Sequence, residues 1–292
     1  PELYPDYAEL AAVLRADGVP PDFEADQPLR YTHRRAGRAE IYLVANPAAE
    51  TLTATGVFRV TGKAPELWNP LTGEIRRAPD WSECGGQTRV PLRLEAHDSL
   101  FVVFRDRARP PDRPGAAKNW TEFIPVGPIA GPWEVRFAAG GGAPERVTLD
   151  RLLSWSAHPD PGVRHFSGVA VYRTTFRWAA KPSGISKPES EIFLDLGRVE
   201  VMARVRLNGA DVGTVWKAPF RLRITRALRP GDNQLEIEVA NLWPNRLIGD
   251  AGLPAHQRVA WTTWNPFTAD TPLFESGLLG PVRLVRPAPG TK

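Results

Sequence analysis

Residues 243–264 concentrate side chains that suit the binding of a hydroxyl-rich ligand. Asn245 and Asp250 can each bond adjacent hydroxyl groups, and Arg246 donates through a planar fork. The tryptophans of the segment add apolar ring faces on which a sugar ring can stack. We therefore predict a carbohydrate site made by Trp243, Asn245, Arg246, Asp250, Trp261 and Trp264.

The same residues also have a structural interpretation. Asn245 and Asp250 could satisfy the backbone of their own loop, with Arg246 simply pairing with Asp250. Trp261 and Trp264 are three positions apart, so in a strand their rings would point to opposite faces, and at most one would meet a ligand. Both interpretations stay open at the level of sequence.

The elements around the site are predicted to be strands, with the site itself on an irregular segment. Residues 243–250 leave a strand and enter a loop, and the stretch from Leu242 to Trp264 is long for a sandwich connection. Its tryptophan content argues against disorder. A scaffold of strands could hold such a loop still.

A catalytic site is not evident from the sequence. Glycoside hydrolysis needs two facing carboxyl groups, about 5–5.5 Å apart for retention. Glu236 and Glu238 share a face at period two, which is the usual solvent face of an amphipathic strand. The five histidines show no zinc-binding spacing, and the single Cys84 excludes an internal disulfide and a cysteine metal cluster.

The composition indicates an all-β protein of about two domains. The chain has 292 residues with 30 Pro and 25 Gly, which is typical of many short strands joined by turns. The net charge of +4 comes from arginines spread singly along strands, so we expect no nucleic-acid partner. No apolar run approaches the ~18 residues that span a membrane, so we expect no membrane partner.

Turn chemistry and alternation locate the strands. Asn208-Gly209 between two alternating runs predicts a tight hairpin. Residues 169–178 alternate strongly, and residues 234–239 alternate after a Pro-Gly turn. Residues 179–189 are predicted to form a polar loop.

The chain divides into four predicted segments. Residues 1–27 are interpreted as the helical remnant of an upstream domain, with a helix over 6–16 that stops before Gly18. Residues 28–105 are predicted to form a small antiparallel β-sandwich, 106–119 a Pro-rich linker and 120–288 a jelly roll. Because Pro1 is not a native start, we expect a fragment of a longer protein, and the absence of a signal peptide says nothing about that protein.

Specific sequence motifs carry a resemblance to a known family over about residues 29–286. Residues 33–46 (HRRAGRAEIYLVAN), 65–75 (PELWNPLTGEI) and 276–284 (SGLLGPVRL) resemble the C-terminal β-sandwich region of bacterial α-L-rhamnosidases of glycoside hydrolase family 106. Residues 192–250 resemble the sugar-binding jelly roll of the β-galactosidase/β-glucuronidase group. The resemblance implies an all-β fold of two antiparallel β-sandwich domains, the second a galactose-binding-like jelly roll, with a short N-terminal helix.

The resemblance also frames the functional hypotheses. In that family catalysis resides in an N-terminal (β/α) barrel, which is absent here. The first hypothesis is a carbohydrate-binding and structural region of a rhamnosidase-like glycoside hydrolase, and the second is a short glycoside hydrolase using jelly-roll carboxylates. The third is a lectin-like sugar-binding protein. The partner would be a plant or microbial glycan containing sugars such as rhamnose or galactose, and the parent enzyme would be secreted or periplasmic.

The resemblance implies no required cofactor, but it does suggest a structural metal. Jelly rolls of this kind often hold one Ca²⁺ through loop carbonyls and a carboxylate, because calcium is a hard cation that prefers oxygen ligands. The candidate ligands are Asp160, Asp195 and Glu275.

Overall fold

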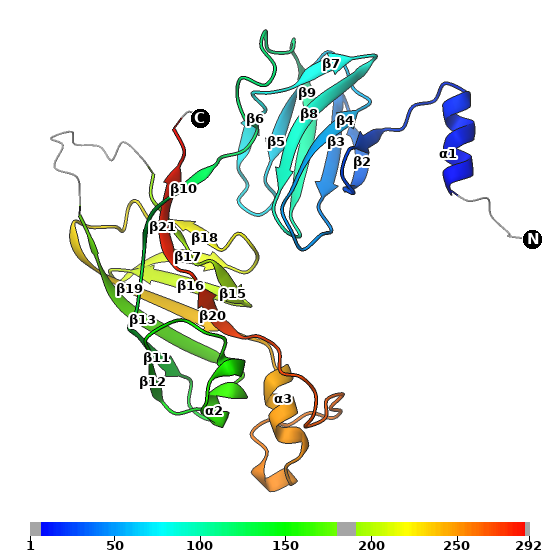
Figure 1. Cartoon of the computed structure of the whole chain (residues 1–292). Coiled ribbons are helices and arrows are strands. Elements are labelled where there is room, and N and C mark those ends of the chain that lie inside the picture. Colours follow the sequence, from blue (N-terminus) through cyan, green and yellow to red (C-terminus); the bar gives the residue numbers. More distant parts are fainter. Residues whose placement is uncertain (1–6, 180–190, 290–292) are drawn as a thin grey trace, which may run out of the picture. The chain divides into compact units, whose positions relative to one another are not determined.

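The computed structural model describes residues 7–179 and 191–289, and the chain divides into two compact units (Figure 1). The division falls between Glu122 and Phe123, so that unit 1 precedes it and unit 2 runs from Phe123 to Ala288. Each unit is described by itself below. Most of the predicted polar loop, residues 180–189, lies outside the described residues.

A short helix opens the described chain, as the sequence predicts. Helix α1 spans Tyr7–Ala16 and ends where Gly18 takes a φ of +73°, a conformation that favours glycine. Leu10, Val13 and Leu14 keep 42–56% of their surface exposed. The apolar stripe of α1 is therefore largely uncovered.

Unit 1 is built from two antiparallel sheets. One has the strand order β1-β4-β8-β7 and the other β2-β3-β9-β5-β6. The strands are β1 (Phe23–Ala25), β2 (Arg30–Ala36), β3 (Ala39–Ala45), β4 (Leu52–Phe58), β5 (Lys63–Trp68), β6 (Ile75–Arg77), β7 (Ser82–Cys84), β8 (Gln87–Leu94) and β9 (Ser99–Arg107).

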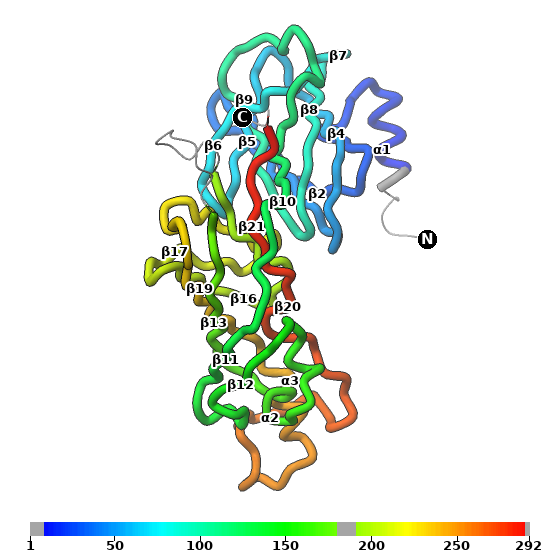
Figure 2. The backbone as a smooth tube through the Cα atoms, turned by 60° about the vertical axis from the view of Figure 1, so that its left-hand side comes forward, coloured from blue at the N-terminus to red at the C-terminus, as the bar shows by residue number. Residues whose placement is uncertain are grey.

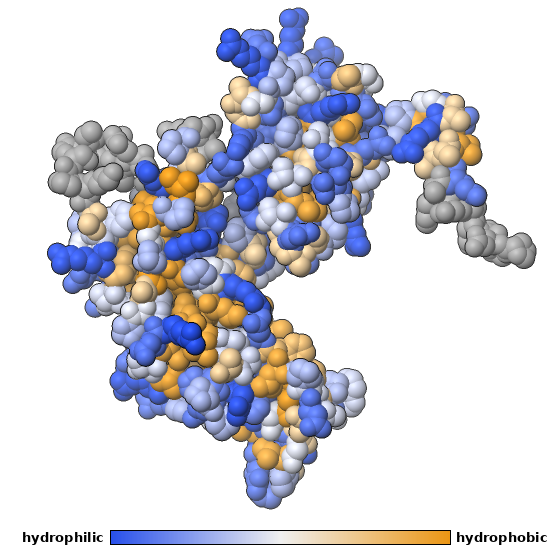
Figure 3. All heavy atoms as spheres, in the orientation of Figure 1, coloured by the Kyte–Doolittle hydropathy of each residue, from blue (hydrophilic) through white to orange (hydrophobic). Residues whose placement is uncertain are grey.

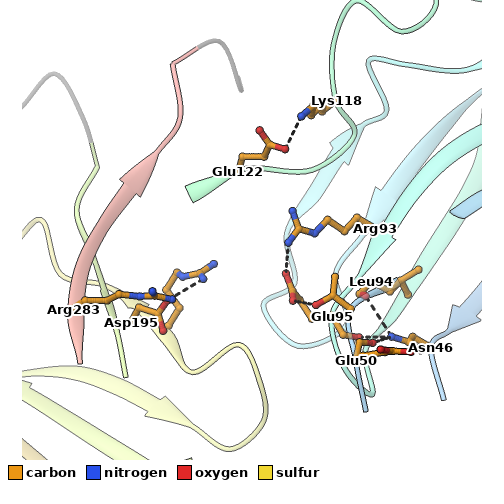
Figure 4. Close-up of polar contacts among 11 residues, drawn as sticks. Asn46, Glu50, Arg93, Leu94, Glu95, Lys118, Glu122, Asp195 and Arg283 are labelled. Carbon is orange, nitrogen blue, oxygen red and sulfur yellow. Dashed lines mark hydrogen bonds and ion pairs between the residues drawn. The ribbon is translucent and has the colours of Figure 1, made fainter. Parts of the chain in front are cut away.

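Alternating burial along these strands creates the core of unit 1. In β8, for example, Val90, Leu92 and Leu94 are buried while the residues between them are not. Their side chains join Tyr42, Phe58 and other buried residues in one apolar cluster. The polar Asn46 is also buried, and its Nδ2 donates to the carbonyls of Glu50 at 2.7 Å and Glu95 at 2.8 Å (Figure 4).

The segment predicted as a linker is fastened to unit 1. No helix or strand is assigned to the described residues 108–122. Within this segment Asn119 is buried, and its side chain bonds the backbone of Asp80 in both directions, at 2.6 and 2.9 Å. The amide of Gly115 donates to the Asp80 carboxylate at 2.7 Å.

Unit 2 is a second antiparallel sandwich. Its main sheets have the orders β12-β11-β13-β19-β16-β17 and β10-β21-β14-β18, and β15 pairs with β20. Figure 2 shows β10 and β21 running side by side. The strands are β10 (Phe123–Pro128), β11 (Trp133–Phe137), β12 (Arg146–Leu149), β13 (Val169–Trp178), β14 (Phe193–Asp195), β15 (Arg198–Glu200), β16 (Met202–Leu207), β17 (Ala210–Val215), β18 (Arg221–Arg223), β19 (Gly231–Ala240), β20 (Gly277–Gly280) and β21 (Arg283–Pro287).

Several sequence predictions for unit 2 are confirmed. Strand β13 has the predicted bounds. Asn208 and Gly209 join β16 to β17 with φ values of +53° and +80°, as a two-residue hairpin of this type requires. The two sheets enclose one apolar cluster, which includes the fully buried Trp133, Trp155 and Tyr172.

Strand β10 was not predicted. It contains Pro125 and Pro128 and carries a bulge between Pro125 and Gly127, so its sequence lacks a strand pattern. Pairing with β21 holds it in place.

Unit 2 contains helices that the sequence did not predict. They are α2 (Pro161–Arg164) and α3 (Pro244–Ala251), with short 3-10 turns at Trp155–Ala157 and Ala255–Gln257. None of the helices in the described part of the chain has the length and apolar character needed to cross a membrane. The fold class is nevertheless all-β, as predicted.

Candidate functional site

The segment predicted as an irregular loop after β19 begins with helix α3, which corrects the prediction. Pro244 occupies the first helical turn, where its missing N–H costs nothing. The helix was not predicted because Pro244 and Gly249 both count as loop signals. Gly249 has a packing role: a Cβ there would lie 2.7 Å from both the Arg246 guanidinium and the His165 ring.

Helix α3 buries an ion pair. Arg246 and Asp250 are one helical turn apart, and Arg246 Nη2 lies 2.8 Å from Asp250 Oδ1. Their side chains are only 10% and 3% exposed. The pairing foreseen by the structural interpretation is thus confirmed. Arg246 Nε is buried and has no hydrogen-bond partner among the described residues.

The same helix fastens the loop that follows it. Asp250 Oδ2 accepts from the amides of Val259 at 3.1 Å and Ala260 at 2.8 Å. Asn265, which the sequence analysis did not single out, donates through Nδ2 to the carbonyl of Leu247 at 2.9 Å. The stretch between these contacts carries Trp261 and Trp264.

Asn245 has a structural position too. Its Nδ2 donates to the carbonyl of Phe274 at 2.7 Å, and its Oδ1 accepts from the Phe274 amide at 2.8 Å. Only 2% of Asn245 is exposed. Asn245 and Asp250 therefore hold the loop, and neither is among the residues that line the pocket described next.

Three of the predicted site residues come together at a pocket of about 410 Å³. Trp243 and Trp261 line it with 63% and 80% of their surfaces exposed, and Arg246 reaches it from α3. Trp264 is 75% exposed but lies outside the lining. The remaining lining comes from Ala138, Ala139, Gly140, Gly141, Phe166, Ser167, Gly168, Val259 and Ala260.

Residues 138–141 also line the pocket, and the sequence analysis did not predict them. Gly140 has a φ of +82°, and a Cβ on Gly141 would lie 2.4 Å from the Phe166 ring. The Gly-Gly-Gly run at 140–142 was the available signal, because close approach of a backbone to a ring or a ligand favours glycine. The pocket residues 243–261 lie about a hundred residues later in the sequence, so the local pattern does not show that the two segments meet.

The charges around the pocket are balanced. Asp250 compensates Arg246 directly. Burial lowers the pKa of His165, and the nearby positive charges of Arg246 and Arg164 lower it further. His165 is therefore neutral near pH 7, and it is not among the residues that line the pocket.

A second concave surface lies on the outer face of the six-stranded sheet. This groove, of about 570 Å³, is lined by residues that include Glu134, Arg173, Arg206 and Glu236. Glu236 lies between the two arginines, 2.8 Å from Arg173 Nη2 and 3.1 Å from Arg206 Nη1.

Both carboxyl groups of this groove are held in the charged form. Burial alone would raise the pKa of Glu236, but hydrogen bonds and charge from Arg173 and Arg206 bring it below its ordinary value. A hydrogen bond from Arg136 lowers the pKa of Glu134. Neither group is suited to act as the proton donor of a glycosidase.

The three carboxylates suggested for calcium have other contacts. Asp160 caps α2 by accepting from the amides of Gly162 and Val163. Asp195 Oδ2 lies 3.2 Å from both Arg221 Nη2 and Arg283 Nη2, and Glu275 is paired with Arg198. In the described ranges no group of three or more His, Cys, Asp or Glu side chains is placed to hold a metal ion. Calcium binding stays a prediction.

Comparisons with known proteins agree with the architecture. Residues 6–81 match the family model described as alpha-L-rhamnosidase, and residues 163–260 match the galactose-binding domain-like model of glycosyl hydrolase family 2. The second match spans Trp243, Arg246 and the amides that Asp250 holds. The chain is thus related to glycoside hydrolases, and the predicted resemblance is confirmed.

Two relatives are similar over much of the chain. The solved structure of a rhamnosidase from Novosphingobium sp. PP1Y is 42% identical, with a TM-score of 0.79 over 95% of this chain and 26% of that one. A protein of Formosa agariphila described as a presumed beta-glucuronidase is 40% identical over an alignment of 179 residues that covers 53% of this chain and 15% of that protein. The chain therefore spans about a quarter or less of each relative's length.

Proposed function

We propose that this chain is a carbohydrate-binding and structural region of a rhamnosidase-like glycoside hydrolase, without hydrolytic activity of its own. The observation that carries the proposal is the convergence of Trp243, Trp261 and Arg246 on one pocket. Exposed tryptophan rings supply the apolar face on which a sugar stacks. The guanidinium supplies donors for ligand oxygens.

The buried side chains beneath the pocket support this proposal. Asp250 orients Arg246 and also fixes the backbone next to Trp261. Binding groups that are held before the ligand arrives lose less conformational entropy on binding. Exposed rings on an anchored loop are thus suited to recognition.

Binding should depend on the two tryptophans that line the pocket. We expect Trp243→Ala and Trp261→Ala each to weaken binding of the cognate monosaccharide by about 1–3 kcal/mol, because each loses apolar contact area. Both rings are mostly exposed, so the melting temperature should change little. Titration calorimetry with L-rhamnose and D-galactose, beside thermal melts, measures both quantities.

Trp216 offers a matched control for these variants. It is 57% exposed and belongs to unit 2, but it does not line the pocket. Trp216→Ala should retain full sugar affinity. Unchanged binding in both pocket variants, with normal stability, would remove the pocket from the proposal.

The first and second hypotheses differ in catalysis: a short glycoside hydrolase should hydrolyse glycosides, whereas a carbohydrate-binding region should not. We expect no hydrolysis of nitrophenyl glycosides above background, because each carboxyl group with a clearly shifted pKa among the described residues is shifted downward, whereas a general acid needs a raised pKa. Turnover that Glu236→Gln abolishes without unfolding the chain would favour the hydrolase instead.

The third hypothesis, a lectin-like protein without an enzymatic parent, shares the binding prediction. The sequence of the complete gene separates the two, because only the first hypothesis requires a catalytic barrel encoded in frame with this chain.

A further inference from the structure

The loop after α3 exposes more aromatic surface than the pocket uses. Trp261 and Trp264 have the largest exposed fractions among the large apolar side chains of the described residues, 80% and 75%. Only Trp261 lines the pocket. In Figure 3 apolar residues reach the surface over α3 and the chain that follows it. Exposed apolar surface of this kind marks an interaction site.

This surface is held in place from both sides. On one side Asp250 accepts from the amides of Val259 and Ala260. On the other side Asn265 bonds the carbonyl of Leu247 in α3. Between them Thr262 Oγ1 donates to the carbonyl of Trp264 at 3.0 Å. The two indole rings are therefore carried by a fixed backbone.

The chemistry of the segment indicates an uncharged ligand. Residues 259–268 (VAWTTWNPFT) contain no ionisable side chain. A polyanion such as a nucleic acid or an acidic polysaccharide would call for several uncompensated Lys or Arg beside the rings. Arg246 reaches the pocket but is paired with Asp250, and Arg258, which precedes the segment, donates through Nε to the carbonyl of Leu253. Aromatic faces alternating with hydroxyl and amide groups instead match a neutral sugar chain.

We infer that the binding surface continues from the pocket to Trp264, and that the site takes a neutral oligosaccharide rather than a single sugar. One sugar lies in the pocket against Trp243 and Trp261, and a neighbouring sugar of the same chain stacks on Trp264. Three residues of backbone place the α-carbons of Trp261 and Trp264 within roughly 11 Å, which neighbouring sugars can bridge. This inference rests on the proposed function.

A protein partner or a second copy fits the surface less well. A stable protein interface covers about 800 Å² on each partner. The three indole side chains of the inferred site account for about 450–750 Å² at most. The area suits a short glycan.

The test compares sugar chains of increasing length on wild type and Trp264→Ala. The probes are D-galactose, galactobiose and galactotriose, and L-rhamnose with an α-linked rhamnose disaccharide. We expect wild type to bind the longer member of one series about tenfold more tightly than its monosaccharide. Trp264→Ala should lose that gain and keep the monosaccharide affinity, whereas Trp216→Ala should keep both. Titration calorimetry gives the affinities, and circular dichroism verifies folding.

The outcomes distinguish this inference from the proposed function. If wild type binds a monosaccharide but gains nothing from chain length, the inference fails and the proposed function stands. An equal loss for monosaccharide and oligosaccharide in Trp264→Ala also overturns it. No binding of any probe by wild type refutes both. Sedimentation showing self-association that Trp264→Ala abolishes would assign the surface to a second copy and overturn the inference.

Discussion

Replacing Asp250 by asparagine should destabilise unit 2 by about 3–5 kcal/mol and abolish sugar binding. The substitution leaves the Arg246 guanidinium buried without its counter-charge, which is among the costliest single changes in a protein interior. It also places a donor group where the Val259 and Ala260 amides, or Arg246, need an acceptor. Urea denaturation followed by tryptophan fluorescence measures the first effect.

Hydrogen exchange can locate the damage. In Asp250→Asn the amides of Val259 and Ala260 should exchange faster, while those of β13 change little. Asp211→Asn is a matched control, because Asp211 also pairs with an arginine but lies exposed on the sheet. That variant should leave the denaturation midpoint nearly unchanged. Equal midpoints for the two variants would contradict a structural role for the buried pair.

A double variant separates the charge from the packing. Arg246→Leu combined with Asp250→Leu removes both buried charges, so it should be more stable than Asp250→Asn alone. It should still fail to bind sugar, because the donors of Arg246 are gone. We therefore expect the buried pair to serve sugar binding more than the stability of the fold.

Local sequence patterns predicted the sheets well. The alternation in residues 169–178 and the turn at Asn208-Gly209 both depend on neighbours in sequence, and both are found in the structure. Strand β10 was not predicted because its two prolines are unfavourable signals for a strand, and because its pairing partner β21 lies more than 150 residues later in the sequence. Helix α3 was not predicted because three of its five buried residues, Asn245, Arg246 and Asp250, are polar. Their burial depends on partners that the local sequence pattern does not show, whereas only Leu247 and Ile248 give an apolar signal.

The site could be predicted only in part, for the same reason. Residue chemistry selected Trp243, Arg246 and Trp261, which the pocket brings together. Residue chemistry could not show that Asn245 would hydrogen-bond the backbone of Phe274, which lies 29 residues away. Of the polar residues in this segment, Arg246 lines the pocket, whereas Asn245 and Asp250 hold its loop. Only long-range contacts distinguish the two.

Asp195 shows how a carboxylate can be fixed by cross-strand partners. It ends β14, directly opposite Arg221 of β18 on one side and Arg283 of β21 on the other. Its Oδ1 also accepts from the amide of Gly197 at 2.9 Å. Arg221 in turn lies over the ring of Phe123, 4.1 Å from its centroid. One buried carboxylate therefore links three adjacent strands; Figure 4 shows its contact with Arg283.

Asp195→Asn should accordingly destabilise unit 2 by about 2–4 kcal/mol. Two guanidinium groups would remain beside each other without the charge that joins them, and Arg221 is largely buried. The upper limit is reduced because Arg283 is 43% exposed and is screened by solvent.

Thermal melts in calcium chloride and in EDTA test the alternative role of Asp195 as a calcium ligand at the same time. If Asp195 only pairs with Arg221 and Arg283, the melting temperature of wild type should be the same in calcium chloride and in EDTA. The melting temperature of Asp195→Asn should then be lowered equally in both solutions. A wild-type midpoint that rises with calcium, and a variant that has lost this rise, would instead make Asp195 a calcium ligand.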